Sequence, residues 1–259
     1  MDLGISGRTA IICASSRGLG RACAEALAEA GVNIVLNGRD VVALETTATD
    51  FRSRFGVDVI AVAADATTVD GRAALVSACP TPDILINNAG GPPPGDWRTF
   101  DSAQWHAAVD SNMLAGIFLI KEFADGMAER GFGRIVNITS ALVKMPAEVI
   151  SLSVAARLGL TGFVRGIAAG YIAKGVTINS LLPEEFETDR LKKNIAFIAE
   201  KSGNSVEEQM RIHHERSPAK RFGRPEEFGA TCAFLCSRYA GYMTGQNILL
   251  DGGRYPGVF

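Results

Sequence analysis

The stretch Thr9-Ala-Ile-Ile-Cys-Ala-Ser-Ser-Arg-Gly-Leu-Gly-Arg-Ala22 decides the fold. Residues 10–12 form a short apolar run that predicts a buried strand, and residues 21–30 have the spacing of an amphipathic helix. Between them, Gly18 and Gly20 remove the Cβ atoms that would keep a phosphate away from backbone N–H groups. The helix that follows directs its unpaired N–H groups and positive dipole end at the same point. Because turns also use glycine for geometry alone, the phosphate interpretation depends on the rest of the chain.

Length and composition narrow the class of protein. The chain has 259 residues, of which 47% are hydrophobic and 21% charged, as expected for one large soluble domain. Twenty-six basic and 28 acidic residues give a net charge of −2, which argues against a nucleic-acid or membrane-surface partner. We expect neither a signal peptide nor an apolar run long enough to cross a bilayer. The five cysteines are scattered without a C-x-x-C pair, which favours a reduced, cytoplasmic protein.

Strand-like and helix-like segments alternate along the chain. Further strands are predicted at residues 33–36, 57–63, 84–87, 133–139, 176–182 and 246–250, and further helices at 41–55, 69–78, 102–130 and 154–173. This alternation indicates parallel βαβ units with helices on both faces of a doubly wound sheet. No linker or repeat divides the chain, so residues 1–259 are predicted to form one α/β domain. Ligands of such sheets bind at the carboxyl ends of the strands, where polar residues gather in this sequence.

Seven short motifs carry a resemblance to a known family. They are Ala14-Ser-Ser-Arg-Gly-Leu-Gly20, Asp65, Asn87-Asn-Ala-Gly90, Asn112, Asn137-Ile-Thr-Ser140, Gly223-Arg-Pro-Glu-Glu227 and Thr244-Gly-Gln-Asn-Ile-Leu-Leu-Asp-Gly-Gly253. With them the chain resembles a short-chain dehydrogenase/reductase of the 3-oxoacyl-carrier-protein-reductase-like type nearly from end to end. The resemblance implies a Rossmann-like fold with strand order 3-2-1-4-5-6-7, a nicotinamide dinucleotide, a small-molecule substrate and a homodimer or homotetramer. It also implies a substrate lid over residues 184–222.

The residues after the second predicted strand bear on the choice of cofactor. An NAD-preferring site usually offers a carboxylate about 20 positions past the glycine turn. Here the corresponding stretch is Asn37-Gly-Arg39, and the first carboxylate is Asp40. Arg39 and Arg17 could neutralise a 2′-phosphate that an aspartate would repel. Solvated surface arginines are the alternative, and of the two we favour NADP(H).

The resemblance also assigns contacts to the dinucleotide. Asp65 and Ala66 are expected beside the adenine, and the segment from Asn88 to Gly90 beside the adjacent ribose. The full expected set is Ala14, Ser16, Arg17, Gly18, Leu19, Gly20, Asn37, Arg39, Asp65, Ala66, Asn88, Ala89, Gly90, Arg157 and Pro183. Ala14 stands where the family often has glycine, so the turn must tolerate one additional methyl group.

The catalytic positions depart from the family pattern. The family uses an Asn, a Ser and a Y-x-x-x-K pair, and Asn112 and Ser140 match the first two. The tyrosine is expected 13 residues after Ser140, where this chain has Ser153, and the lysine position holds Arg157. Residues at i and i+4 share a helix face, so both should point into the site. A serine is a much weaker acid than a phenol, and an arginine cannot release a proton in the working pH range.

Three interpretations follow from this substitution. In the first, the protein is an NADPH-dependent reductase whose proton comes from water, Ser153, Ser140 or the substrate. In the second, it binds the cofactor with little turnover and acts as a partner subunit or sensor. In the third, it catalyses a hydride transfer that needs no enzymic acid. None of the four tyrosines (Tyr171, Tyr239, Tyr242 and Tyr255) has the expected spacing, although one could approach in space.

Other candidates carry less information. The loop that ends at Trp97 should border the pocket or form a rigid surface loop, and Glu184 places a carboxylate where relatives commonly have glycine. His213-His214 lacks companion ligands, so we predict a solvated pair in the lid and no metal site. Cys232 and Cys236 share a helix face and are predicted to lie in the core.

Overall fold

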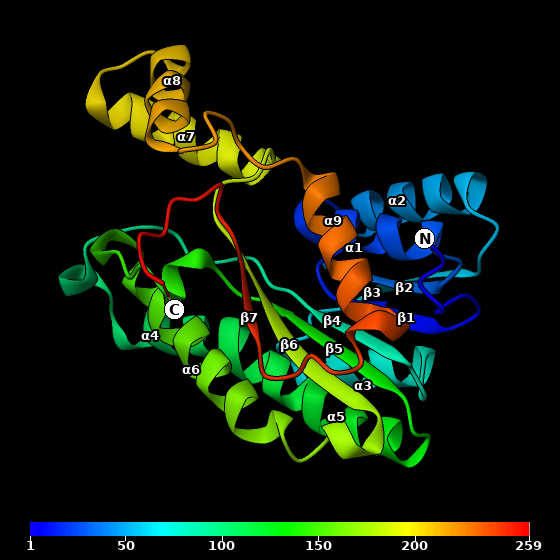
Figure 1. Ribbon diagram of the computed structural model, residues 1–259. Coiled ribbons are helices and arrows are strands. Elements are labelled where there is room, and N and C mark those ends of the chain that lie inside the picture. Colours follow the sequence, from blue (N-terminus) through cyan, green and yellow to red (C-terminus); the bar gives the residue numbers. More distant parts are fainter. Residues whose placement is uncertain (259) are drawn as a thin grey trace.

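Seven parallel strands form the centre of the computed structural model, which describes residues 1–258 (Figure 1). They are β1 (Thr9–Ile12), β2 (Asn33–Gly38), β3 (Val59–Ala63), β4 (Ile84–Asn87), β5 (Gly133–Ile138), β6 (Val176–Pro183) and β7 (Asn247–Leu250). Their order in the sheet is β3-β2-β1-β4-β5-β6-β7, as predicted. The strand order switches from one side of β1 to the other between β3 and β4, so that Ile11 of β1 pairs with Val35 of β2 and with Leu85 of β4. A ligand crevice is expected at the carboxyl ends of these strands.

Helices cover both faces of the sheet. They are α1 (Gly18–Glu29), α2 (Val41–Arg54), α3 (Val69–Ala78), α4 (Ser102–Val109), α5 (Ala115–Glu129), α6 (Ser151–Ala168), α7 (Asp189–Ser202), α8 (Val206–Arg216) and α9 (Pro225–Cys236). One core cluster joins α1, α2 and α9 to the sheet through residues such as Leu27, Phe51 and Phe228. The other joins α3, α5 and α6 to the opposite face. The helices α7 and α8 project beyond the carboxyl ends of the strands (Figure 1).

Several predicted segments need correction. The helical run over 102–130 is not continuous, because a π-helical turn at Asp110–Leu114 separates α4 from α5. The helix predicted at 154–173 begins three residues earlier, at Ser151, and ends at Ala168. No boundaries were predicted for α7, α8 or α9. The prediction that Cys232 and Cys236 lie in the core is confirmed, since both are fully buried.

The segment Glu148–Ala168 also differs from expectation. It has 21 residues and a mean hydropathy of 1.3, so by length and composition alone it is long and apolar enough to cross a membrane. Interior helices of globular domains pass the same test. In this structure Ala156, Leu160 and Val164 are buried, and the segment packs along β6. Its N-terminal half carries two of the predicted catalytic residues.

Candidate active site and nucleotide cleft

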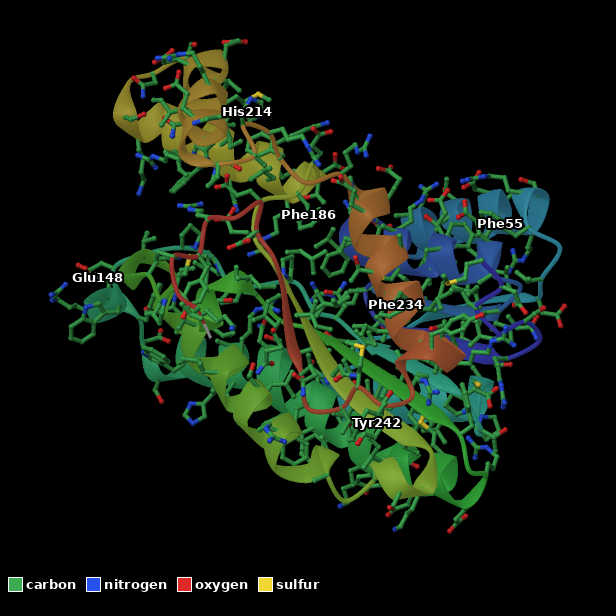
Figure 2. All side chains as sticks on the ribbon, viewed as in Figure 1. Phe55, Glu148, Phe186, His214, Phe234 and Tyr242 are labelled. Atoms are coloured by element: carbon green, nitrogen blue, oxygen red, sulfur yellow. The ribbon has the colours of Figure 1, made fainter. Side chains whose placement is uncertain are left out.

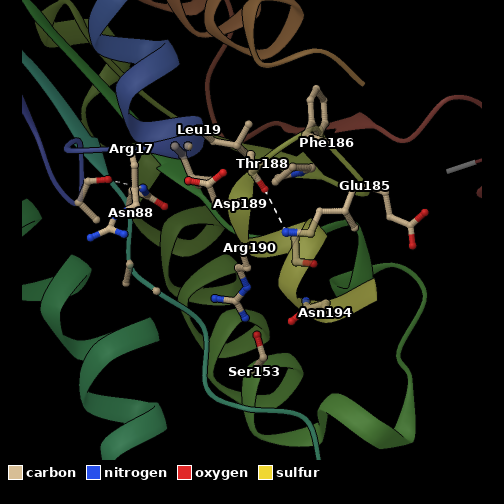
Figure 3. A pocket seen from close by; sticks show the side chains of 18 of the residues that line it. Arg17, Leu19, Asn88, Ser153, Glu185, Phe186, Thr188, Asp189, Arg190 and Asn194 are labelled. Atoms are coloured by element: carbon tan, nitrogen blue, oxygen red, sulfur yellow. Dashed lines mark hydrogen bonds between the residues drawn. The ribbon is translucent and has the colours of Figure 1, made fainter. Parts of the chain in front are cut away.

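The turn after β1 has a backbone that leaves little room for side chains. Ala14 and Gly18 both have positive φ angles, of +47° and +60°. A Cβ atom on Gly20 would lie 2.4 Å from the carbonyl oxygen of Ala14. The same oxygen accepts a hydrogen bond from Nδ2 of Asn88 at 3.3 Å, which ties the turn to the end of β4 (Figure 3). No side chain caps α1, so its first N–H groups are available to an anion.

Two adjoining cavities lie along this edge of the sheet. The larger, of about 660 Å³, extends from the glycine turn to Ser153 (Figure 3). The smaller, of about 330 Å³, lies beside the ends of β2 and β3 and shares Ala14, Arg39 and Asn88 with the first. Every residue expected at the dinucleotide lines one of the two cavities, except Gly20, which lies directly behind Ala14. The described residues therefore fit an elongated, phosphorylated ligand.

The two arginines predicted to select the cofactor both line the larger cavity, and Arg39 also lines the smaller one. Arg17 forms an ion pair of 3.0 Å with Asp40, and Arg39 lies 3.7 Å from Asp65. Both pairs are open to solvent, so each contributes little to stability and leaves the guanidinium groups free to move. The amide of Asn37 has a structural role instead, because it donates to two main-chain oxygens at the end of β3.

At the other end of the larger cavity, Ser140, Ser153 and Arg157 come together. Ser140 follows β5 and accepts a hydrogen bond from the Leu142 amide at 3.2 Å. Ser153 lies in the first turn of α6, and its Oγ accepts a hydrogen bond of 3.1 Å from Nε of Arg157. The predicted shared helix face of Ser153 and Arg157 is therefore observed.

The guanidinium of Arg157 is buried and bound only to neutral groups. Nη1 donates to the carbonyl oxygens of Ile138 and Thr139 at 2.8 and 2.7 Å, and Nη2 to that of Ala89 at 3.3 Å. Burial lowers the pKa of Arg157 to about 10, and the positive charge of Arg190 acts in the same direction. Within residues 1–258 no carboxylate lies within ion-pair distance of Arg157. Arg157 thus joins the ends of β4 and β5 and keeps an uncompensated charge at the cavity.

Asn112 lies apart from the other three predicted catalytic residues. The π-helical turn directs its side chain inward, where Nδ2 donates to Ser111 Oγ at 2.7 Å and to the carbonyl of Gly90 at 3.5 Å. Its buried Oδ1 has no partner among the described residues. It lines a cavity of about 30 Å³ that also touches Arg157, rather than the larger cavity.

Within residues 1–258, no tyrosine lines any of these cavities. The hydroxyl of Tyr171 donates to Asp125, and Tyr242 is 96% exposed. In this conformation, then, the phenols of Tyr171 and Tyr242 are not directed to Ser153.

The structure adds cavity residues that the sequence did not identify. His213 was expected to be solvated, but it is buried, and its Nδ1 lies 2.7 Å from Oε1 of Glu185. This is a correction: α8 folds back over the end of β6 and brings His213 to a carboxylate 28 positions away. Glu184 forms an ion pair with Arg254, and burial together with the charge of Glu185 raises the pKa of Glu184 to about 7. The described residues contain no cluster able to hold a metal ion.

Arg190 is the other residue not identified from the sequence. It lies in the first turn of α7, lines the larger cavity, and donates from Nη1 to the carbonyl of Gly91 at 3.2 Å. The start of α7 is defined by Thr188, whose hydroxyl accepts from the Leu191 amide at 3.3 Å (Figure 3). The start of α7 and the loop after β4 are thus in contact across the cavity.

Comparison with known proteins agrees with this geometry. The family model described as enoyl-(acyl carrier protein) reductase matches residues 13–254. The chain belongs to the short-chain dehydrogenase/reductase family. The relatives of this short-chain dehydrogenase/reductase include gluconate 5-dehydrogenase from Gluconobacter oxydans, which is 31% identical over 96% of this chain and 95% of its own. An NADPH-dependent reductase from Bacillus subtilis is 31% identical over 98% of this chain and its whole length.

Solved structures extend the similarity to the whole fold. L-sorbose reductase from Gluconobacter frateurii, complexed with NADPH and L-sorbose, superimposes with a TM-score of 0.94 at 30% identity and covers both chains fully. An NADPH-dependent reductase involved in bacilysin biosynthesis gives a TM-score of 0.92 at 30% identity, over 98% of this chain and all of its own. The predicted single Rossmann-like fold is confirmed.

Proposed function

We propose that this short-chain dehydrogenase/reductase binds NADP(H) and transfers a hydride between the nicotinamide and a carbonyl or alcohol carbon of a small substrate. The observation that carries the proposal is the continuous cavity that joins the glycine turn to Ser153 and Arg157. Structural relatives solved with NADPH support the choice of cofactor. When bound, the dinucleotide supplies or accepts the hydride.

At the nucleotide end, the free amides at the start of α1 would hold the phosphates, and Arg17 and Arg39 would hold a 2′-phosphate. Exchanging both arginines for glutamine is expected to weaken NADPH binding by about tenfold or more and to leave NADH binding nearly unchanged. Fluorescence titration measures both affinities. Arg98→Gln, an exposed arginine far along the chain from the turn, is the matched control. Equal losses for NADPH and NADH would contradict the 2′-phosphate assignment.

At the chemical end, Arg157 would polarise the Ser153 hydroxyl and hold it in place. Because Nε of Arg157 donates to Ser153 Oγ, the hydroxyl hydrogen of Ser153 is free to be donated to a substrate oxygen. Ser140 offers a second hydroxyl in the same cavity. The buried positive charge stabilises negative charge that develops on that oxygen. Ser153 passes its proton to the substrate oxygen and takes one from bound water, so the pair serves as an atypical proton donor in place of a phenol.

The segment 184–222 is proposed as a lid over the substrate. It includes α7 and α8, it lines the cavity, and Arg190 joins it to the loop after β4. Closure of such segments excludes water from the reacting atoms and often limits turnover. Two relatives are named for gluconate and L-sorbose, which makes sugars and sugar acids the first substrates to test.

Turnover is tested with NADPH deuterated at C4 of the nicotinamide and a panel of ketoses, oxo acids and β-oxoacyl thioesters. We expect oxidation of NADPH with at least one of them and deuterium on the carbinol carbon of the product. Tight NADPH binding with no oxidation across the panel would support the other candidate, a cofactor-binding partner subunit or sensor. That candidate is favoured by one observation, the absence of a tyrosine at the cavity within residues 1–258.

We also propose that the protein is a homodimer or homotetramer in the cytoplasm. The exposed side chains of Phe118 on α5 and Leu158 on α6 give an apolar surface for a second copy. All five cysteines are unpaired and buried, as suits a reducing compartment. Light scattering of the wild type and of Phe118→Glu tests the assembly: we expect a dimer or tetramer that dissociates in the variant.

A further inference from the structure

The charges that line the larger cavity are unevenly distributed along it. At the end of β6, the carboxylate of Glu184 is paired with Arg254, and that of Glu185 with His213. Both acidic groups that face this part of the cavity therefore have a cationic or proton-donating partner. They are not available to neutralise the arginines near Ser153.

Near Ser153, two guanidinium groups have no such partner. Arg157 binds three main-chain carbonyls and one hydroxyl, and Arg190 binds the carbonyl of Gly91. Over residues 1–258, neither arginine has a carboxylate within 4.0 Å. Asp189, the nearest acid along the chain, points toward Leu19 and away from Arg190 (Figure 3).

The two positive charges act on the same small volume. The side chain of Arg190 extends from α7 toward Ser153 (Figure 3), and Ser153 is bonded to Arg157. The charge of Arg190 disfavours the protonated form of Arg157, and partial removal from water lowers the pKa of Arg190 itself. Two like charges near one cavity wall repel each other unless an anion lies between or beside them. This part of the cavity is therefore complementary to a negative group.

We propose that Arg190 binds a carboxylate of the substrate beside Ser153, so that the substrate class is an oxo acid and its corresponding hydroxy acid. The inference rests on the proposed reductase function. The planar guanidinium offers two parallel N–H groups, which suits the two oxygens of a carboxylate. Since Arg190 reaches across from the lid, binding of the carboxylate would also draw α7 toward the β4 loop and Ser153.

A dinucleotide phosphate is the other possible source of the negative charge. The free amides at the start of α1 are the phosphate site proposed above, and Arg17 and Leu19 lie at that end of the cavity, away from Ser153 (Figure 3). Arg190 is directed to the opposite end. We therefore assign the anion beside Arg190 to the substrate.

The test uses NADP⁺ with oxo acids, because these two oxidised compounds cannot react with each other. Calorimetry on the NADP⁺-saturated protein measures the affinities of 2-oxobutanoate, 4-oxopentanoate and 5-oxohexanoate, each against its neutral amide. We expect at least one acid to bind about tenfold or more tightly than its amide in the wild type. Arg190→Gln should abolish that preference, and Arg190→Lys, which keeps the charge but loses the fork, should retain part of it. Lys193→Gln, an exposed cation on the same helix, should leave it unchanged.

The outcomes separate this inference from the function on which it rests. Equal binding of every acid and its amide by the wild type would overturn the carboxylate subsite. So would an acid preference that persists in Arg190→Gln, or a loss of NADP⁺ affinity in that variant, which would assign Arg190 to a dinucleotide phosphate. A wild type that fails to bind NADP⁺ would instead overturn the proposed function.

Discussion

The two ends of the larger cavity differ in how closely they follow the family. At the end of β1, the chain keeps the glycine turn, and the contact between Asn88 and Ala14 holds it against β4. At the end of β5, Ser153 and Arg157 are in hydrogen-bond contact, and we propose that they stand in place of the phenol and lysine that the family resemblance predicts. On the proposed function, the same sheet edge carries a phosphate-binding turn of the family type and an altered proton-donating pair.

From this difference we infer that cofactor binding and proton transfer place separate requirements on the sequence. The glycine turn depends on backbone shape, which one added side chain would destroy. The proposed catalytic pair depends on the acidity and charge of two side chains that share one helix face. Arg157 also has a structural function, since it binds three carbonyls from two strand ends.

The largest effect is expected at the nucleotide end. In Gly20→Val the new Cβ would lie 2.4 Å from a main-chain oxygen and 2.8 Å from Nδ2 of Asn88, so the turn must open. NADPH affinity should fall by about 100-fold or more, because several charge-assisted hydrogen bonds are lost together. Gly162→Ala, where nothing lies within 4 Å, is the control. NADPH affinity of the Gly20 variant within threefold of the wild type, by fluorescence titration, would refute the phosphate-binding turn.

The next effect is expected at the chemical end. Arg157→Gln leaves buried carbonyls of Ile138 and Thr139 without their donors, which should lower the free energy of unfolding by about 2–3 kcal/mol. For a domain of this size the melting temperature should fall by about 4–10 °C. Arg165→Gln, on the exposed part of the same helix, should change stability by less than about 0.5 kcal/mol. Similar melting temperatures for the two variants would contradict the structural function of Arg157.

A smaller, pH-dependent effect is expected at Glu184. Because its pKa is raised from 4.5 to about 7 in the fold, ionisation disfavours the native state. Its contribution to stability is therefore highest below pH 4.5, falls as the pH rises toward 7, and stays low above that. In the Glu184→Gln variant the side chain cannot ionise, so this loss of stability with rising pH should be absent. The melting temperature of the variant relative to the wild type should rise by about 2–4 °C between pH 5 and pH 8. A constant difference across this range would contradict the raised pKa.

The smallest effect is expected at Ala14. Its φ of +47° is unfavourable for a residue with a Cβ atom, whereas glycine adopts it readily. Ala14→Gly should raise the free energy of unfolding by about 1 kcal/mol and preserve NADPH binding. Chemical denaturation measures the change. A loss of stability would show that the methyl group contributes packing that outweighs the backbone strain.

Much of the fold follows from the sequence because the pattern is periodic. Alternating buried strands and amphipathic helices predicted the doubly wound parallel sheet, and the family resemblance implied its strand order. Residues 69–78 and 84–87 were predicted with their observed bounds. The break at Asp110–Leu114 was not predicted, since a π-helical turn inserts one residue without any change in helix propensity. The starts of α1 and α6, which no side chain caps, lie three residues before the predicted positions. The capped starts of α2 and α3 were predicted at the observed residues.

The candidate site was predictable where spacing along one helix decides proximity. Ser153 and Arg157 are four positions apart, and their contact follows from helix geometry. The pairing of His213 with Glu185, and the reach of Arg190 to Gly91, join segments 28 and 99 positions apart. Such contacts depend on how α7 and α8 fold over the sheet, which no local pattern encodes. Figure 2 shows His214 on the projecting helix α8 and Phe186 near the base of the projecting segment.

The central claim is that the nucleotide end is intact and only the proton-donating pair is altered. It is tested most directly by the double variant Ser153→Tyr with Arg157→Lys, with Ser153→Tyr alone as a second variant in case the first is unstable. For a carbonyl substrate of the wild type, or for the whole panel if there is none, we expect the rate of NADPH oxidation to rise by about tenfold or more. NADPH affinity should stay within about threefold. Folded variants that bind NADPH normally but reduce carbonyls no faster than the wild type would contradict the account.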